Sequence, residues 1–551
     1  MANGAQALVK TLVNAGVDTC FSNPGTSEMH FVAALDSADL RAVLCLFEGV
    51  ASGAADGYAR MADKPAATLL HLGCGLGNAL ANLHNARKAR VPMVNIVGDH
   101  ATDHVQYDAP LQSDIETVAR NVSTWVRTTA STAELASDAA EAVSVAMGPP
   151  AQIATLILPA DVSWTEGAEP APAPAPAEPP PAPEAKVREV ADVIARSGKK
   201  VALLLGRRAL REAGLRAASQ IAESSGAKLF CEVFPTRLER GAGLPAVERI
   251  AYLAELASVQ LDGYEHLVLV DAKSPVSFFA YPGKKSDLVP QGCTTHSLVA
   301  PEEDAVASLQ ALVEALGASG AAPKLQQPGR PGLPRGRLNA GKVCQAIGAL
   351  LPPNAIISDE AQTSGVKLSV STAGAPRHDL LTLTGGAIGQ GLPVAVGAAT
   401  ACPERPVLAL VGDGSALYTI QALWTAAREG LDVTTVIFNN RSYAILNIEL
   451  ARVGAQKIGP EALSQLDLSE PAIDFVSMAQ ALGVPARRVT RAEELIAALE
   501  AAFASPGPFL IDAIVPSEYE GLKLKALPRL LDALGSVPSP LAKAIKSKVV
   551  P

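Results

Sequence analysis

Residues 406–440 read PVLALVGDGSALYTIQALWTAAREGLDVTTVIFNN, and this stretch decides the fold of the region around it. An apolar run at 407–411 ends at GDG, a helical pattern covers about 419–429, and a second apolar run at 433–438 ends at NN. Strand, helix and strand at this length predict one right-handed crossover between two parallel strands. In such units ligands bind outside the carboxyl ends of the strands.

Both strand ends carry oxygen-donor side chains, Asp413 after the first strand and Asn440 after the second. Gly412 and Gly414 let a bulky group approach the backbone, and the helix start beyond Ser415 offers free N–H donors to an anion. Hard oxygen ligands beside a phosphate-binding turn suit Mg²⁺. Taken separately, GDG is typical of a tight turn and Asn-Asn of a strand cap. Together, at two strand ends of one unit, they favour a metal and phosphate site.

GDG, a gap of some two dozen residues and then NN resembles the signature of thiamine diphosphate (ThDP) enzymes. The resemblance implies that the Asp413 and Asn440 side chains and the Ser442 carbonyl bind Mg²⁺. Ile388 stands where these enzymes have an apolar wedge under the cofactor, although an apolar residue in a glycine-rich loop is also typical of a core. The cofactor-binding residues implied in this half of the chain are Gln362, Thr363, Gly386, Ile388, Gly412, Gly414, Ser415, Tyr443, Ala444 and Ile445.

The composition is that of a well-buried globular protein. Hydrophobic residues make up 48% of the 551, and a net charge of −9 without a basic cluster argues against a nucleic-acid partner. No apolar stretch reaches the roughly 18 residues that a membrane helix needs, and the start of the chain lacks the layout of a signal peptide. Seven scattered cysteines without a CxxC pair indicate neither a zinc site nor a disulfide framework, so the reducing cytoplasm is the expected compartment.

Apolar strands and helices alternate along most of the chain, which is typical of α/β domains. Two stretches interrupt this pattern: a polyproline-type linker, EPAPAPAPAEPPPAPEA at 169–185, and a Gly/Pro-rich linker at 318–337. The sequence therefore predicts three doubly wound parallel-sheet domains and a tail, at 1–168, 186–317, 338–516 and 517–551.

Glu48 lies in LCLFEGVASGAADGYAR, where an apolar strand runs into a helix rich in Ala and Gly. A Glu in the first turn of a helix is commonplace, because the helix dipole stabilises it. The stretch also resembles the pyrimidine-binding domain of ThDP enzymes, in which one Glu hydrogen-bonds N1′ of the aminopyrimidine. The resemblance implies that Glu48 activates the cofactor, that Asn78 shapes the pyrimidine pocket, and that the central and diphosphate-binding domains follow in that order.

FSNPGTSE at 21–28 and the later LLHLGCGLGN resemble benzoylformate decarboxylase and its relatives, where a hydroxyl residue follows NPG and a His lies at the later strand end. The resemblance implies that Thr26 positions the substrate carboxylate and that His71 transfers a proton. On the residues alone, a helix-capping Thr and a buried structural His are the commoner explanation. The glycine spacing of LGCGLGN does not match the dinucleotide-binding pattern.

The resemblance covers nearly the whole chain, with two departures from benzoylformate decarboxylase. SPVSFFAYPG at 274–283 offers Phe279 and Ala280, but no His, where that enzyme has a second active-site His. Glu449 stands at a position that is apolar in that family, and because burying an unpaired carboxylate is costly, benzoylformate is not the expected substrate. The expected substrate pocket comprises Thr26, His71, Gln112, Leu446 and Glu449.

These departures favour carboligation. The expected enzyme uses ThDP and Mg²⁺ to decarboxylate a pyruvate-like 2-oxo acid and joins the resulting enamine to a second carbonyl compound, as acetolactate synthases do. A non-ligating decarboxylase and an inactive cofactor-binding subunit are the alternatives, and the intact Glu48 argues against the second. FAD is not expected, because LVDAKSPVSFF stands where biosynthetic acetolactate synthases carry an Arg-Phe-Asp-Asp-type motif. The resemblance also implies a homodimer at least, with a homotetramer as the expected assembly.

Overall fold

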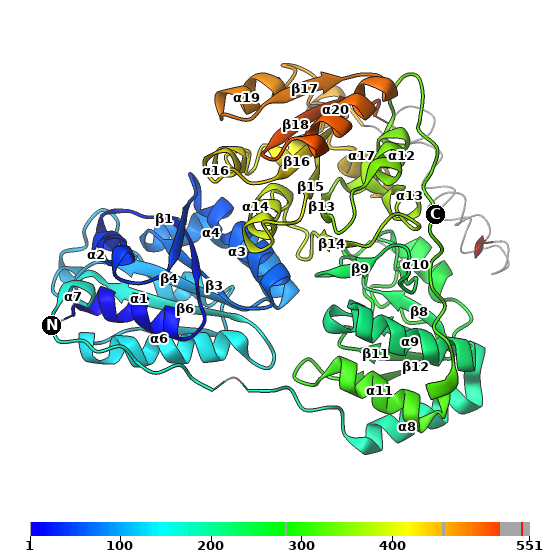
Figure 1. Cartoon of the computed structure of the whole chain (residues 1–551), viewed down its shortest axis with the longest axis horizontal. Helices are drawn as coiled ribbons and strands as arrows, with labels where there is room; N and C mark the ends of the chain where they lie inside the picture. Colours follow the sequence, from blue (N-terminus) through cyan, green and yellow to red (C-terminus); the bar gives the residue numbers. More distant parts are fainter. Residues whose placement is uncertain (1, 176, 282–283, 454–457, 518–541, 544–551) are drawn as a thin grey trace.

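Three sheets, each covered by helices, make up the protein, which is known from a computed structural model that describes residues 2–175, 177–281, 284–453, 458–517 and 542–543 (Figure 1). All but one of the strand pairs in these sheets are parallel. The expected α/β class with parallel sheets is therefore confirmed. The expected tail at 517–551 lies almost wholly outside the described residues.

The first sheet has the order β2-β1-β3-β4-β6-β5. Five of its strands coincide with apolar runs of the sequence, whereas β5 does not, because its side chains are at most half-buried. The strands are β1 (Thr19–Asn23), β2 (Arg41–Leu44), β3 (Ala66–Leu70), β4 (Met93–Asp99), β5 (Trp125–Thr128) and β6 (Ile153–Pro159). The main helices around them are α1 (Gly4–Asn14), α3 (Glu48–Ala62), α4 (Leu72–Ala89) and α6 (Thr132–Met147).

The second sheet, with the order β10-β8-β7-β11-β12, is joined to the first body by an extended segment that contains the Pro-rich stretch (Figure 1). Its strands are β7 (Val201–Leu205), β8 (Lys228–Cys231), β10 (Glu248–Arg249), β11 (His266–Val270) and β12 (Thr294–Val299). Its main helices are α8 (Glu184–Ser197), α9 (Glu212–Ser225), α10 (Ala254–Leu261) and α11 (Ala305–Ala315).

The third sheet has the order β17-β18-β16-β15-β13-β14-β9. Its strands are β9 (Leu238–Arg240), β13 (Ile356–Glu360), β14 (His378–Thr382), β15 (Val407–Gly412), β16 (Val433–Asn439), β17 (Ala486–Val489) and β18 (Phe509–Ile514). Its main helices are α12 (Ala340–Leu350), α14 (Gly391–Ala401), α16 (Ala422–Arg428), α17 (Ala444–Arg452), α19 (Phe475–Ala481) and α20 (Ala492–Ala504). The edge strand β9 comes from the chain segment expected in the central domain and pairs antiparallel with β14.

The crossover expected around GDG is present: β15 and β16 are parallel, with Gly412 paired to Phe438. The helical part differs from the expected single helix at 419–429. A short helix α15 (Asp413–Ala416) begins directly at the strand end, and α16 follows after a turn. The physical reason is that Gly412 is extended and caps α15, so the first free N–H groups come at Asp413 rather than beyond Ser415.

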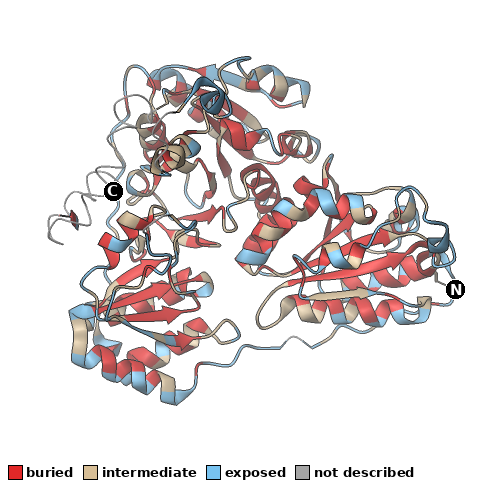
Figure 2. Cartoon of the chain, turned by 180° about the vertical axis from the view of Figure 1, so that it is seen from behind, coloured by how far each residue is buried: buried red, intermediate tan, exposed pale blue. Residues whose placement is uncertain are grey.

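Helices α3 and α14 join the first and third bodies, and Figure 2 shows their facing surfaces as buried. Their backbones approach very closely, because a Cβ built on Gly57 would lie 2.1 Å from the Val394 carbonyl oxygen and one built on Gly397 would lie 1.8 Å from that of Ala54. The Ala- and Gly-rich sequence after Glu48 therefore serves this contact between helices.

A buried polar network reinforces the same contact. Arg60 donates to both carboxylate oxygens of Asp56 at 2.7 Å, and Gln390 donates to Asp56 at 2.6 Å across the two bodies. The guanidinium of Arg60 also donates to the backbone carbonyl of Thr382 at 2.8 Å. Because every charge here is paired and hydrogen-bonded, the network fixes the register of α3 against the start of α14. In the part of the chain that the structure describes, no helix is both long and apolar enough to cross a membrane.

Candidate active site

The GDG turn and the Asn-Asn pair lie together at the carboxyl edge of the third sheet. Asp413 accepts the backbone N–H of Gly414 at 2.8 Å and that of Arg441 at 2.5 Å, which ties the end of β15 to the loop after β16. Asn440 accepts the N–H of Ser442 at 2.9 Å through its side-chain oxygen. Two of the three residues expected to hold Mg²⁺, Asn440 and Ser442, therefore lie in one loop, which we call the metal loop (residues 440–443), and the third, Asp413, is tied to that loop through the Arg441 N–H.

The surroundings of Asp413 fit a divalent cation. The residue is 3% exposed, and burial raises its pKa to about 6 because nearby N–H donors only partly offset the desolvation of its charge. Among the described residues no cluster of three His, Cys, Asp or Glu side chains could hold a metal ion. A set of one carboxylate, one amide and one carbonyl oxygen needs phosphate oxygens and water to complete the shell, which is the arrangement Mg²⁺ commonly takes.

The glycines beside the metal loop leave room for a large ligand. A Cβ built on Gly412 would have no neighbour closer than the Ser415 hydroxyl, at 3.8 Å. At Gly414 the reason for glycine is different, because a Cβ there would lie 2.3 Å from the Tyr443 ring. Gly386 has a φ of +79°, which explains why a glycine turns the loop before α14.

Glu360 is a residue of this site that the sequence reasoning missed. It ends β13 beside Val411 of β15 and is 1% exposed. Its carboxylate accepts three backbone N–H groups, from Gly389 at 2.6 Å, Gly391 at 2.7 Å and Gln390 at 3.3 Å. Burial nevertheless raises the pKa of Glu360 to about 7.

Glu360 thereby holds the glycine-rich loop that carries Ile388, which is half-buried. The signal for it was present, since IISDE places an acidic residue at a strand end. The expectation instead settled on Gln362 and Thr363 of the following 3₁₀ turn, which lie just beyond the same strand end. Gln362 has a φ of +49°, and a non-glycine residue in that region is uncommon and often marks a functional site.

Glu48 begins α3 at the carboxyl edge of the first sheet. It is 7% exposed, and its carboxylate accepts a hydrogen bond of 3.0 Å from the amide of Asn78 in α4. A Cβ on Gly75 would lie 3.0 Å from the Glu48 carboxylate, so α4 crosses very near it. The structure thus brings together Glu48 and Asn78, the two residues expected around the pyrimidine ring.

His71 caps α4 and is held by Glu28, which the sequence reasoning also missed. Nδ1 of His71 lies 2.9 Å from the Glu28 carboxylate, which also accepts the N–H of Gly25 at 2.7 Å and the hydroxyl of Ser27 at 2.8 Å. Because a carboxylate only accepts hydrogen bonds, Nδ1 carries the proton and Nε2 is left free for chemistry. Glu28 itself is 1% exposed.

Two glycines make room for this pair. A Cβ on Gly25 would lie 2.2 Å from Nδ1 of His71, and one on Gly98 would lie 1.7 Å from a Glu28 oxygen. Leu72, which follows His71, has a φ of +52° although it is buried, so the backbone beside the His is strained. The acidic residue three positions after Gly25 in NPGTSE was the available signal for Glu28.

Replacing Glu28 with Gln is expected to lower turnover by roughly 10–100-fold, by analogy with other residues that orient a functional His. The amide cannot hold the Nδ1–H tautomer as firmly, whereas ThDP affinity should stay within a few-fold. Ser27→Ala is the matched control, because it removes a hydroxyl that lies 3.4 Å from Nδ1 and donates to one Glu28 oxygen, but keeps the other Glu28 oxygen that contacts His71. Steady-state rates and cofactor titration on both variants test this, and equal rates for the two would contradict the role of Glu28.

The other two expected substrate residues of the first body lie near this edge. Thr26 is exposed and starts the 3₁₀ turn that contains Glu28. Gln112 precedes Ser113, and a Cβ on Gly73 would lie 2.0 Å from the Ser113 hydroxyl, so the loop of Gln112 crosses the start of α4.

The structure corrects the expectation for Glu449, because the Glu449 carboxylate is paired. It accepts a hydrogen bond from the Tyr281 hydroxyl and bonds of 3.0 and 3.1 Å from Arg452. Arg452 also reaches Glu255 at 2.9 Å and lies over the Tyr281 ring. The central body thus supplies Tyr281, and Arg452 of the same helix supplies the positive charge, so the cost of burying an unpaired charge no longer argues against an aromatic substrate.

Leu446, on the same helix, is exposed, and Phe278 lies close to Gly386, since a Cβ on that glycine would be 3.7 Å from its ring. Ala444 and Ile445 form the first turn of α17 directly after the metal loop. Phe278 of the central body therefore lies against the glycine-rich loop of the third body.

Comparison with known proteins agrees with this geometry. Residues 2–120 match the family model for the thiamine pyrophosphate enzyme N-terminal TPP binding domain, and residues 365–513 match that for the C-terminal TPP binding domain. A Mycobacterium tuberculosis protein, provisionally named acetolactate synthase large subunit IlvX, is 60% identical over 517 residues, which cover 94% of this chain and 99% of that protein.

Benzoylformate decarboxylase of Pseudomonas aeruginosa is 30% identical over 530 residues, 91% of this chain and 96% of the relative. Among solved structures, a thiamine diphosphate-dependent 4-hydroxybenzoylformate decarboxylase from Rhodococcus jostii shares the fold, with a TM-score of 0.82, 24% identity and coverage of 94% of this chain and 99% of that chain. With both TPP binding domains matched and relatives similar over nearly their whole length, the chain belongs to the thiamine pyrophosphate enzyme family.

Proposed function

We propose that this enzyme decarboxylates a pyruvate-like 2-oxo acid with ThDP and Mg²⁺ and joins the remaining carbon fragment to a second carbonyl compound. The observation that carries the proposal is that Glu48 lies at the carboxyl edge of one parallel sheet, and that Asp413 and the metal loop lie at the carboxyl edge of another. The relative named an acetolactate synthase, at 60% identity, supports carboligation as the outcome.

Each residue has a definite task in this proposal. When bound, ThDP supplies the carbanion chemistry that removes carbon dioxide. Asp413, Asn440 and the Ser442 carbonyl hold Mg²⁺, and Glu48 exchanges a proton with a ring nitrogen of the cofactor. Nε2 of His71 holds or moves a proton near the reacting carbonyl oxygen. The apolar side chains of Ile388 and Leu446 exclude water.

A simple decarboxylase is the second candidate, because benzoylformate decarboxylase is a relative at 30% identity and the paired Glu449 removes one objection to an aromatic substrate. Position 280 holds Ala rather than a second His. Without this second proton donor, attack of the remaining carbon fragment on another carbonyl compound is favoured over its protonation and release as an aldehyde. An inactive subunit would not need the Glu48–Asn78 pair.

The deciding experiment is product analysis by mass spectrometry on purified enzyme with ThDP, Mg²⁺ and a panel of 2-oxo acids. Carboligation predicts a product that contains carbons of two carbonyl compounds. An aldehyde as the sole product would establish the decarboxylase alternative, and absence of any turnover with bound cofactor would establish the inactive subunit. FAD is not part of the proposal, and the cytoplasm is its expected compartment.

We also propose a homodimer at least, and a homotetramer as the full assembly, in which one cofactor lies between Glu48 of one chain and Asp413 of another. Both half-sites expose large apolar side chains, which usually mark an interface. On the first body these are Leu46, Tyr107 and Leu111, and on the other two bodies they are Phe278, Phe279, Tyr418 and Leu446.

Mixing equal amounts of inactive Glu48→Gln and Asp413→Ala chains should restore up to about one quarter of the activity, because half of the dimers are hybrids and one of the two sites in each hybrid takes an intact half from each parent. Subunit exchange is verified by native mass spectrometry, and each variant alone is the control. An active monomer in light scattering, or exchanged chains without regained activity, would defeat the shared site.

A further inference from the structure

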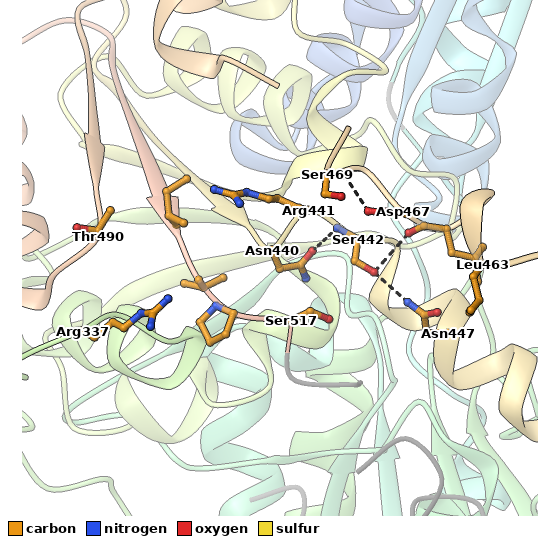
Figure 3. A pocket seen from close by; sticks show the side chains of 14 residues that line it. Arg337, Asn440, Arg441, Ser442, Asn447, Leu463, Asp467, Ser469, Thr490 and Ser517 are labelled. Atoms are coloured by element: carbon orange, nitrogen blue, oxygen red, sulfur yellow. Dashed lines mark hydrogen bonds between the residues drawn. The ribbon is translucent and has the colours of Figure 1, made fainter. Parts of the chain in front are cut away.

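A cavity of about 520 Å³ lies at the carboxyl ends of β16, β17 and β18, beside the metal loop (Figure 3). Arg337 and Thr490 lie at one end of it, and Asn440, Arg441 and Ser442 line its middle. Its lining includes none of the residues of the GDG turn, so it is separate from the expected diphosphate position although it shares Asn440 and Ser442 with the metal loop. Its volume is within the roughly 300–1,000 Å³ of sites that bind metabolites.

The lining carries an excess of positive charge. In the described part of the chain, the guanidinium groups of Arg337 and Arg441 have neither an ion pair nor a hydrogen-bond partner. One carboxylate, Asp467, also lines the cavity, and it already accepts the N–H of Ser469 at 2.9 Å. The hydroxyl of Ser517, also in the lining, is buried and has no hydrogen-bond partner among the described residues.

Arg441 is also unusual in its backbone, with a φ of +58°. Its N–H bonds Asp413, so the left-handed conformation belongs to the metal loop, and the Arg441 side chain lines the cavity (Figure 3). Gly and Asn adopt this conformation most readily, so an Arg at this position is uncommon.

We propose that this cavity binds a small oxyanion, the phosphate or carboxylate group of a metabolite, at a site distinct from the cofactor. Two forked guanidinium groups match the geometry of carboxylate and phosphate oxygens. The Asn440 amide and the Ser517 hydroxyl add neutral donors, whereas the Thr490 hydroxyl already donates to Glu494 at 3.3 Å. Leu463 and Leu466 offer apolar surface to the rest of the ligand. The ligand sits against the loop expected to hold the metal, which suits an effector of the enzyme.

The test uses the holoenzyme saturated with Mg²⁺ and ThDP, so that the diphosphate position is filled. Isothermal titration with inorganic phosphate, and separately with malonate, at constant ionic strength in chloride should show one saturable site per chain. Arg337→Ala should weaken that binding at least tenfold, and Arg337→Lys, which keeps the charge but loses the fork, should weaken it less. Binding of phosphate alone identifies a phosphorylated ligand, and binding of malonate alone identifies a carboxylate.

Arg335→Ala is the matched control, because Arg335 is exposed, lies two residues before Arg337 in the sequence and does not line the cavity. It should leave the anion affinity unchanged. Arg441→Ala should cause the same loss as Arg337→Ala, but the conclusion rests on Arg337, which lies outside the metal loop. Circular dichroism verifies that each variant is folded. Absence of saturable binding for both anions, or equal affinity in Arg337→Ala and Arg335→Ala, would overturn the proposal whether or not the proposed reaction is correct.

Discussion

Replacing Glu48 with Gln should lower turnover by about 10²–10⁴-fold, the usual contribution of a positioned acid–base group. The carboxamide keeps the shape of the side chain and the hydrogen bond to Asn78, but it can neither take up nor release a proton. ThDP affinity should therefore stay within a few-fold of wild type. Steady-state assays and isothermal titration of the cofactor measure the two quantities separately.

The control for this prediction is Asn78→Ala, which removes the partner of Glu48 but leaves the carboxyl group in place. Its turnover should fall far less than that of Glu48→Gln. A Glu48→Gln enzyme whose rate stays within a few-fold of wild type would refute the assignment of Glu48 as the group that activates the cofactor.

Asp413→Ala should abolish Mg²⁺-dependent ThDP binding, with a loss of affinity of at least about 10²-fold. Asp413 is the single carboxylate in the expected ligand set, and a diphosphate needs its charge neutralised by the metal. The substitution also removes the acceptor for the Arg441 N–H, so the metal loop loses its tie to β15. Titration of ThDP with and without Mg²⁺ measures the effect.

Asp432→Ala is a suitable control, because Asp432 precedes β16 at the opposite edge of the same sheet and burial raises its pKa as well. It should leave cofactor affinity intact. Unchanged ThDP binding by Asp413→Ala, or an equal loss in the two variants, would show that Asp413 is not the metal ligand.

Local patterns were sufficient where a structural element depends on neighbouring residues. The apolar runs before GDG and NN became β15 and β16 because continuous Val, Leu and Ile sequences are typical of strands buried on both faces. Short or half-exposed strands such as β5 and β9 were missed because their side chains carry no such pattern. The placement of β9 in the third sheet depends on a pairing with β14 more than 130 residues away, which no local pattern encodes.

The candidate site divides in the same way. The sequence by itself determined that Asp413, Asn440 and Glu48 stand at strand ends, because a residue's place in a strand-to-helix turn follows from the pattern around it. Only the tertiary structure decided which groups accompany them: Glu28 beside His71, Glu360 beneath the glycine-rich loop, and Tyr281 and Arg452 around Glu449. Apart from Arg452, which lies in the same helix as Glu449, these partners come from other elements or other bodies. The energy of a buried carboxylate depends on donors that meet it only when the chain has folded.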